Sequence, residues 1–200
     1  MQRLVIRLAA VAAAVLTVVW VAQTADAEAT SIDMETYANP GVQELSCSAG
    51  EGAEDRPSPL KQLRFSYDGG EGLLCYGAPS ARGRDVIGGL VPFGSPWRAG
   101  ANEPTTFHLS AATSIGGVSL EAGSYSFYVI PGESEWELML NTNTDRWGIP
   151  INADVRSTEV GSFTAAAGST DAMVETLTYS NADGAIVLEW ENTRISIPIG

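Results

Sequence analysis

The stretch Ser124-Tyr125-Ser126-Phe127-Tyr128-Val129 places three large apolar side chains, Tyr125, Phe127 and Val129, at every second position. Successive side chains of a β-strand point to opposite faces, so these three would share one face. Pro131-Gly132 follows the stretch and is a turn signal. The pattern predicts a half-buried strand that begins and ends within about ten residues.

The same period of two recurs along the chain, with turn signals at short intervals. A short helix is expected within Asn152–Ala172, where small and acidic residues obscure any period. Apart from the N-terminus, the chain lacks a long helical period, so we predict one all-β domain, an antiparallel β-sandwich or jelly-roll-like fold. The further alternating positions are Leu63, Phe65 and Tyr67; Trp136, Leu138 and Leu140; Leu177 and Tyr179; Ile186, Leu188 and Trp190; and Ile195, Ile197 and Ile199.

The N-terminus has the features of a signal peptide. Arg3 and Arg7 precede an almost wholly apolar run from Leu8 to Ala22, which is shorter than the roughly 20 residues needed to span a bilayer. Ala25-Asp26-Ala27 matches the small-x-small cleavage rule. We therefore predict cleavage after residue 27, with an uncleaved anchor as the alternative, and an exported protein, periplasmic or extracellular, without stable membrane insertion after cleavage.

The next segment, residues 28–59, is rich in Gly, Ser, Pro and acidic residues and has little apolar periodicity. Such a composition is typical of a flexible arm or linker. The sequence thus predicts three parts: a signal peptide over 1–27, an acidic arm over 28–59 and the β-sandwich domain over 60–200.

The chain is acidic, with 11 Lys and Arg against 24 Asp and Glu, and a formal net charge of −13. Nucleic acids and anionic lipid surfaces are bound by clusters of Lys and Arg that neutralise phosphate. We therefore expect no nucleic-acid partner. We expect the excess of acidic residues to serve the solubility of the protein. The alternative is that these residues form a surface that binds a cationic ligand.

Cys47 and Cys75 are the two cysteines of the chain, so a disulfide within it could join only these two. An oxidising compartment would favour the bond. The sequence does not show whether the two side chains come within reach, and the pairing is left open.

A series of short motifs follows in a fixed order along the chain: Tyr76-Gly77, Arg82-Gly83-Arg84, Ile87-Gly88-Gly89-Leu90-Val91-Pro92-Phe93-Gly94, Trp97-Arg98-Ala99-Gly100-Ala101-Asn102-Glu103, Ile115-Gly116-Gly117, Ala122-Gly123-Ser124-Tyr125, Ile130-Pro131-Gly132, Trp136, Asn141-Thr142-Asn143, Trp147-Gly148 and Thr193-Arg194-Ile195-Ser196-Ile197-Pro198. In these motifs and their order the chain resembles a bacterial family known as domain of unknown function 2911 (DUF2911). The resemblance covers roughly residue 60 to the C-terminus and implies an exported or lipid-anchored protein without an assigned activity. A lipid-attachment cysteine is absent here, which argues against anchoring.

Common catalytic and metal motifs are missing. Nucleophilic hydrolysis needs a base beside Ser or Cys, and the one imidazole, His108, alternates with Phe107 and Leu109, as expected of a hydrogen-bonded strand residue. A run from Asn141 to Asp145 imitates the start of a calcium loop, but Arg146 occupies the position that requires Gly. We expect no metal and no cofactor.

The segment from Trp97 to Glu103 is the candidate site. In one interpretation, Arg98 and Glu103 form an ion pair that pins a loop, Asn102 bonds backbone groups and Trp97 fills the core. In the other, Trp97 and Trp147 wall a pocket, and Arg98, Asn102 and Glu103 supply its oriented polar groups. Arg82 and Arg84 join such a pocket if the fold brings them close.

The sequence therefore predicts an exported envelope protein that acts as a non-catalytic binding or interaction module. Its partner would be a small polar molecule, a glycan or an envelope protein. One alternative is a hydrolase or isomerase that uses Glu103 as acid or base and Arg98 to stabilise an anion. A purely structural envelope protein is a further alternative.

Overall fold

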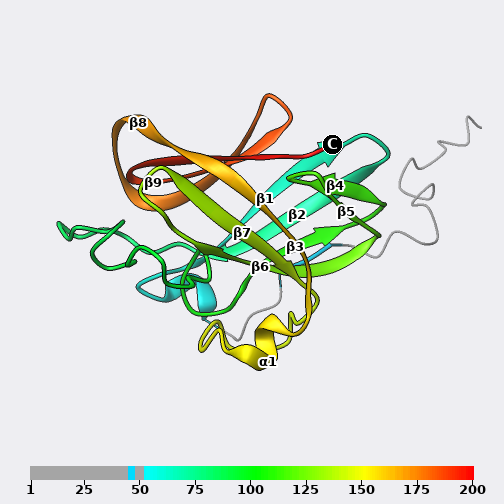
Figure 1. Cartoon of the computed structure of the whole chain (residues 1–200), viewed down its shortest axis with the longest axis horizontal. Coiled ribbons are helices and arrows are strands. Elements are labelled where there is room, and N and C mark those ends of the chain that lie inside the picture. Colours follow the sequence, from blue (N-terminus) through cyan, green and yellow to red (C-terminus); the bar gives the residue numbers. More distant parts are fainter. Residues whose placement is uncertain (1–44, 48–51) are drawn as a thin grey trace, which may run out of the picture. The chain divides into compact units, whose positions relative to one another are not determined.

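The computed structural model describes residues 45–47 and 52–200, which form a seven-stranded antiparallel sheet and a separate two-stranded hairpin (Figure 1). The strand order in the large sheet is β1-β2-β3-β6-β7-β8-β9, and β4 pairs with β5. The elements are η2 (Ala53–Asp55), β1 (Leu60–Tyr67), β2 (Gly70–Gly77), β3 (Thr105–Leu109), β4 (Thr113–Ile115), β5 (Val118–Leu120), β6 (Gly123–Ile130), β7 (Glu135–Asn141), α1 (Ala153–Arg156), β8 (Glu159–Ala182) and β9 (Ala185–Pro198).

The predicted signal peptide, residues 1–27, lies outside the described residues. Among the residues that are described, no helix has the length and apolar character needed to cross a membrane.

The alternating residues of β6 decide which side of the sheet becomes the core. Phe127 is fully buried and lies opposite Thr105 of β3 and Leu140 of β7, so all three share the inner face. Other strands that the sequence predicted also bury their apolar positions in this core, as Phe107, Leu138 and Ile186 show. The prediction of an all-β antiparallel domain is confirmed.

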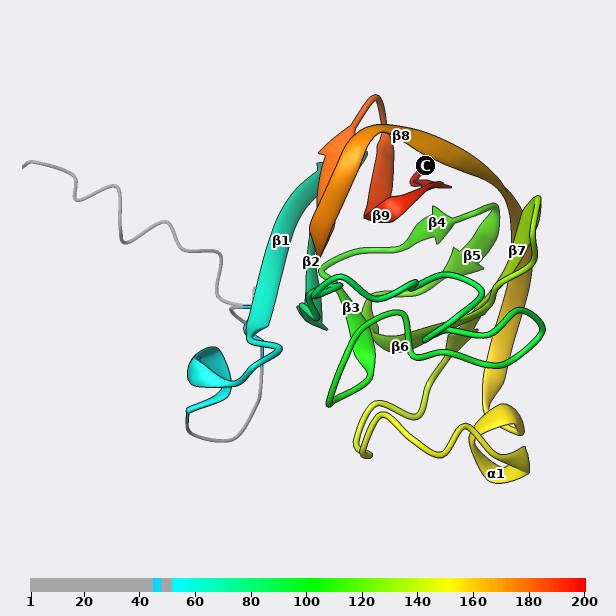
Figure 2. The same cartoon turned by 90° about the vertical axis from the view of Figure 1, so that its left-hand side faces the viewer.

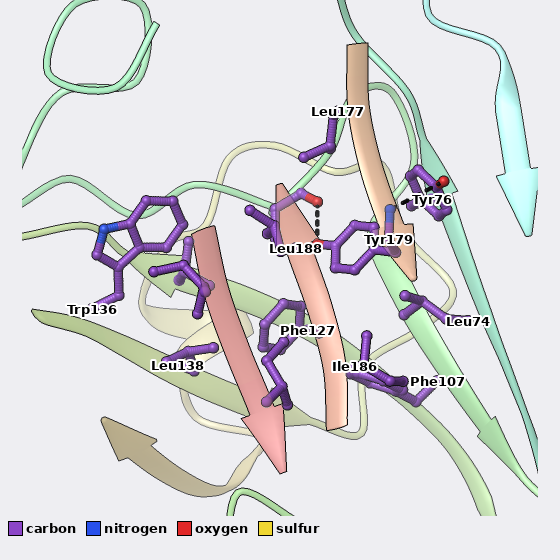
Figure 3. Close-up of a cluster of buried hydrophobic side chains, with 14 of the residues drawn as sticks. Leu74, Tyr76, Phe107, Phe127, Trp136, Leu138, Leu177, Tyr179, Ile186 and Leu188 are labelled. Atoms are coloured by element: carbon purple, nitrogen blue, oxygen red, sulfur yellow. Dashed lines mark hydrogen bonds between the residues drawn. The ribbon is translucent and has the colours of Figure 1, made fainter. Parts of the chain in front are cut away.

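The sheet closes over itself through β8. The first part of this strand, up to Ala166, pairs with β7, and the part from Ala167 onward pairs with β9. Figure 2 shows β8 arching from the side of β7 toward β1. The inner side chains of β9 thereby pack against those of β3, β6 and β7 in one core (Figure 3), which produces the sandwich.

The expected short helix is α1, and the Asn152 side chain caps it by accepting a hydrogen bond from the backbone of Val155 at 3.1 Å. The rest of Asn152–Ala172 forms the first half of β8, which sequence periodicity did not predict. Its pairing with β7 and β9 supplies the backbone hydrogen bonds that hold this half extended.

The outer face of the sheet has a second buried layer. Tyr128, Met139 and Asn141 point away from the core and are nevertheless almost fully buried. Asn141 donates to the Val155 carbonyl at 2.5 Å and accepts from Thr158 at 2.9 Å, so the segment around α1 is fastened across this face. The loop between β7 and α1 belongs to this cover, and its Asp145 and Arg146 line a cavity together with Thr106 and His108 of β3.

Residues 78–104 connect β2 to β3 without a regular strand. Three isolated bridges order this connection: Ser80 with Thr176 of β8, Ile87 with Val91, and Trp97 with Val129 of β6. The hydroxyl of Tyr179, buried in the core, donates to the Ala99 carbonyl at 2.7 Å. Burial raises the pKa of Tyr179 well above its ordinary value, so the hydroxyl remains a donor. The candidate segment is therefore anchored to the core.

Candidate functional site

Two residues bend the segment from Trp97 to Glu103. Ala99 and Asn102 have positive φ values of 53° and 65°, which are uncommon for residues with a side chain. The Thr105 hydroxyl and the Tyr179 hydroxyl both donate to the Ala99 carbonyl and hold this bend in position.

Trp97 fills space at the edge of the core, as one interpretation of the sequence expected. Its indole stacks on Trp190 with ring centroids 5.6 Å apart and meets the edge of Trp136 at 6.2 Å. The indole N–H donates to the Gly100 carbonyl at 3.1 Å. The ring is only partly buried, so one part of it remains available to line a cavity.

Glu103 does not pair with Arg98, and this expectation was wrong. Its carboxylate is bound instead by Arg56, with Nη1 and Oε1 2.7 Å apart. Arg56 belongs to the segment just before β1, and sequence alone did not show that the fold brings it to Glu103.

The Arg98 guanidinium donates no hydrogen bond to any described residue, and its Nε atom is buried without a partner among them. Burial lowers the pKa of Arg98, and the charge of nearby Glu103 acts in the opposite direction. Gly148 makes room for this side chain, because a Cβ atom there would lie 2.3 Å from Arg98 Cδ. Arg98 is therefore held in position by packing and by a neighbouring charge, and its hydrogen-bonding capacity is left unused within the described residues.

Asn102 bonds backbone groups, as expected. Its side chain donates to the Ser58 carbonyl at 3.0 Å, and its own carbonyl accepts from the Gly148 backbone at 3.1 Å. It thus joins the segment before β1 to the loop after β7.

Four of the predicted site residues line one cavity of about 330 Å³, which we call the indole cavity. Trp97 and Trp190 form one wall, and Arg84 and Arg98 contribute the charged groups. Two nitrogens of Arg84 donate to the carbonyls of Ala81 and Ser80, both at 2.8 Å, which fixes its guanidinium. The remaining lining residues are Ser58, Pro79, Leu90, Val91, Gly100, Ala101 and Asn102.

The structure does not bring Arg82 or Trp147 into the indole cavity. Arg82 is exposed, and its side chain donates to the Pro57 carbonyl at 3.2 Å. Trp147 is 55% exposed on the loop after β7. Both were predicted to line a pocket with Arg98, because a guanidinium can bind an anionic group and an indole can form an apolar wall. In the fold, neither side chain lies in the cavity that Arg98 lines.

A second cavity, of about 290 Å³, lies over the outer face of the sheet, and we call it the outer cavity. It brings Glu103 together with His108, Asp145 and Arg146. The sequence did not predict this grouping, because His108 lies on β3 whereas Asp145 and Arg146 lie on the loop after β7. The other lining residues are Leu60, Cys75, Pro104, Thr106 and Thr144.

His108 is the hydrogen-bonded strand residue that its alternation predicted. Its ring nitrogens lie 2.8 Å from the Ser124 hydroxyl and 3.3 Å from the Thr106 hydroxyl. Burial lowers its pKa, which favours the neutral ring.

The run from Asn141 to Asp145, which resembles the start of a calcium loop, forms a structural turn. Asn141 accepts a hydrogen bond from the backbone of Asn143 at 2.7 Å, which occupies the first oxygen that a calcium loop would use. Within residues 45–47 and 52–200, no group of three or more His, Cys, Asp and Glu side chains is arranged to hold a metal ion.

Cys47 and Cys75 form a disulfide, with their Cα atoms 5.6 Å apart. The bond closes a span of 28 residues and ties the segment before β1 to β2. The structure thus resolves the pairing that the sequence left open.

Residues 58–199 match the family model described as protein of unknown function DUF2911. The chain belongs to the DUF2911 family. The matched region includes the nine strands of the described residues and every residue that lines the indole and outer cavities, whereas Cys47 and Arg56 precede it. No curated protein and no solved structure matches this DUF2911 chain.

Glu103 has an ion-pair partner, whereas Arg98 has no hydrogen-bond partner among the described residues, so their substitutions should differ in their effect on stability. Glu103→Gln should destabilise the domain by about 1–3 kcal/mol, because it removes a charged hydrogen bond and leaves Arg56 partly buried without its partner. Arg98→Gln should change the free energy of unfolding by less than about 0.5 kcal/mol, because Arg98 makes no hydrogen bond to a described residue. Urea unfolding of both variants measures this, and equal losses would contradict the assignment of Glu103 to Arg56.

Proposed function

We propose that this DUF2911 domain is a non-catalytic binding module whose indole cavity takes a small molecule with an apolar or aromatic body and a carboxylate group. The observation that carries the proposal is Arg98, which lines the cavity and donates no hydrogen bond to a described residue. Ligand pockets typically combine apolar walls with a few oriented polar groups. Trp97, Trp190, Leu90 and Val91 supply such walls.

The charge of the cavity favours an anionic group. The chain as a whole carries a formal charge of −13, whereas the charged groups that line this cavity are two guanidinium groups. The cavity therefore differs in the sign of its charge from the protein as a whole. Guanidinium is the side-chain group best suited to bind a carboxylate through two parallel hydrogen bonds. Arg84 and Arg98 would therefore orient the ligand, and the indoles would cover its body.

We propose further that the protein acts outside the cytoplasm, in the bacterial periplasm or beyond it. The apolar run that follows Arg3 and Arg7, together with the disulfide, supports this location, since disulfides form and persist in oxidising compartments.

The binding proposal is tested by titrating the protein with sodium benzoate and sodium phenylacetate and following its tryptophan fluorescence. We expect saturable quenching, and at least about tenfold weaker binding in Arg98→Gln, because a hydrogen bond to a charged group contributes about 1.5–3 kcal/mol. Arg194→Gln is the control, since Arg194 is an exposed arginine that pairs with Glu189. Absence of quenching, or equal affinity in Arg98→Gln and wild type, would contradict the proposal.

A second candidate function is acid or base catalysis in the outer cavity, for which the shared lining of Glu103, His108 and Asp145 is the specific support. Hydrolysis of nitrophenyl glycosides and esters tests it. Activity that disappears in Glu103→Gln, measured where that variant remains folded, would support catalysis. Activity that persists in this variant, or no turnover by wild type, counts against it.

A further inference from the structure

A third cavity, of about 310 Å³, has a different chemistry from the indole cavity. It lies between the loop that carries Asp85 and Phe93, the turn between β6 and β7, and the paired part of β8 and β9 around Ser169 and Thr193. It is lined by carboxylates and by no Lys, Arg or His, so we call it the acidic cavity.

Trp136 supplies the observation that singles out this cavity. The side chain is fully buried and lines the cavity, yet its indole N–H has no hydrogen-bond partner among the described residues. In Figure 3 the indole nitrogen lies on the side of the ring that faces away from Phe127 and Tyr179. Buried polar atoms are almost always hydrogen-bonded in proteins, so this donor calls for an acceptor.

The other polar groups offer both acceptors and donors. Asp85 and Glu133 are exposed carboxylates whose oxygens accept no hydrogen bond from a described residue, whereas Glu191 accepts from the backbone of Val86 and Ile87 at 3.2–3.3 Å. Asn192 adds an amide with two donors and one acceptor.

Phe93 provides an apolar surface beside these groups. Its ring is 43% exposed and is positioned by Gly88, where a Cβ atom would lie 2.8 Å from the ring. Gly88 has a φ of 96°, so a larger residue is disfavoured there by the backbone as well as by the ring. The aromatic ring is therefore exposed in a defined place on the loop.

We infer that the acidic cavity binds a neutral saccharide. A sugar hydroxyl both donates and accepts, so one such ligand can donate to Asp85 and Glu133 and accept from the Trp136 N–H. The C–H face of a sugar ring is apolar and fits against an aromatic ring such as Phe93. An organic cation would satisfy the carboxylates and the aromatic ring, but it offers no acceptor to Trp136. This inference concerns a cavity separate from the indole cavity and does not depend on the proposed function.

The test is nuclear magnetic resonance of the ¹⁵N-labelled protein, in which each tryptophan gives one indole N–H signal. The Trp136→Phe variant identifies the signal of Trp136. The probes are maltose, cellobiose and diacetylchitobiose, with tetramethylammonium chloride as the rival ligand. We expect at least one saccharide to shift the Trp136 signal saturably at millimolar concentration, and tetramethylammonium to leave it unchanged.

The matched variant is the double substitution Asp85→Asn and Glu133→Gln, which changes two exposed side chains and should leave the fold intact. It should weaken saccharide binding about tenfold or more. Glu121→Gln, an exposed carboxylate outside the cavity, should bind as wild type does. The inference is overturned by any of three results: no saccharide shifts the Trp136 signal, tetramethylammonium alone shifts it, or the double variant retains wild-type affinity.

Discussion

Replacing Phe127 by alanine is expected to destabilise the domain by about 3–5 kcal/mol, the usual cost of removing a fully buried aromatic ring. Phe127 has no exposed surface and lies in β6, between β3 and β7. Its ring packs edge to face against Phe107, with ring centroids 5.6 Å apart, and it belongs to the buried core that the curled sheet encloses. The strands around it are fixed by their own hydrogen bonds, so the cavity left by the substitution cannot collapse fully.

Urea unfolding measures this effect, and Phe93→Ala is the matched control. Phe93 is 43% exposed, so its truncation should cost about 1 kcal/mol or less. A domain of this kind is stable by only about 5–15 kcal/mol, and Phe127→Ala should therefore remove a large share of the total. Similar losses in the two variants would show that the core is not centred on β6.

Replacing Cys47 and Cys75 by serine is expected to lower stability by about 3–4 kcal/mol, because the disulfide restricts the unfolded chain over a span of 28 residues. Cys75 is almost fully buried in β2, and the bond holds the segment before β1 against it. That segment also supplies Arg56 to Glu103 and the Ser58 carbonyl to Asn102. The substitution should therefore loosen one side of both the outer and the indole cavities.

Thermal unfolding with and without a reducing agent measures the contribution of the disulfide. Reductant should lower the Tm of wild type to that of the double serine variant and leave the variant unchanged, since the chain has two cysteines in all. A wild-type Tm that does not respond to reductant, once loss of the bond is verified by thiol titration, would contradict the prediction.

Strands with strictly alternating apolar residues could be predicted from the sequence because their pattern is local. The stretches around Phe127, Leu138 and Leu188 each mark their buried face within a few residues. The first half of β8 could not be predicted in this way, because its Ala, Gly, Ser and Thr residues show no apolar period. It is a strand because β7 and β9 both pair with it.

The candidate site shows the same division. Trp97, Arg98, Asn102 and Glu103 could be selected from the sequence because one short segment holds an unusual set of side chains. Their partners could not, since Arg56 and Trp190 are distant in sequence and only the fold brings them near. The expected pair of Arg98 and Glu103 illustrates the difference, because closeness in sequence did not place their charged atoms in contact.

The sequence by itself determined the all-β class, the DUF2911 resemblance that residues 58–199 confirm, and the segment on which the indole cavity is built. These properties depend on local patterns, and local patterns can be read from neighbouring residues. Three features depended on the tertiary structure alone. They are the closure of the sheet by β8, the ion pair between Glu103 and Arg56, and the position of Glu103, His108 and Arg146 around one cavity. Each of these joins residues far apart in the chain, and which of them meet depends on how the curled sheet packs as a whole.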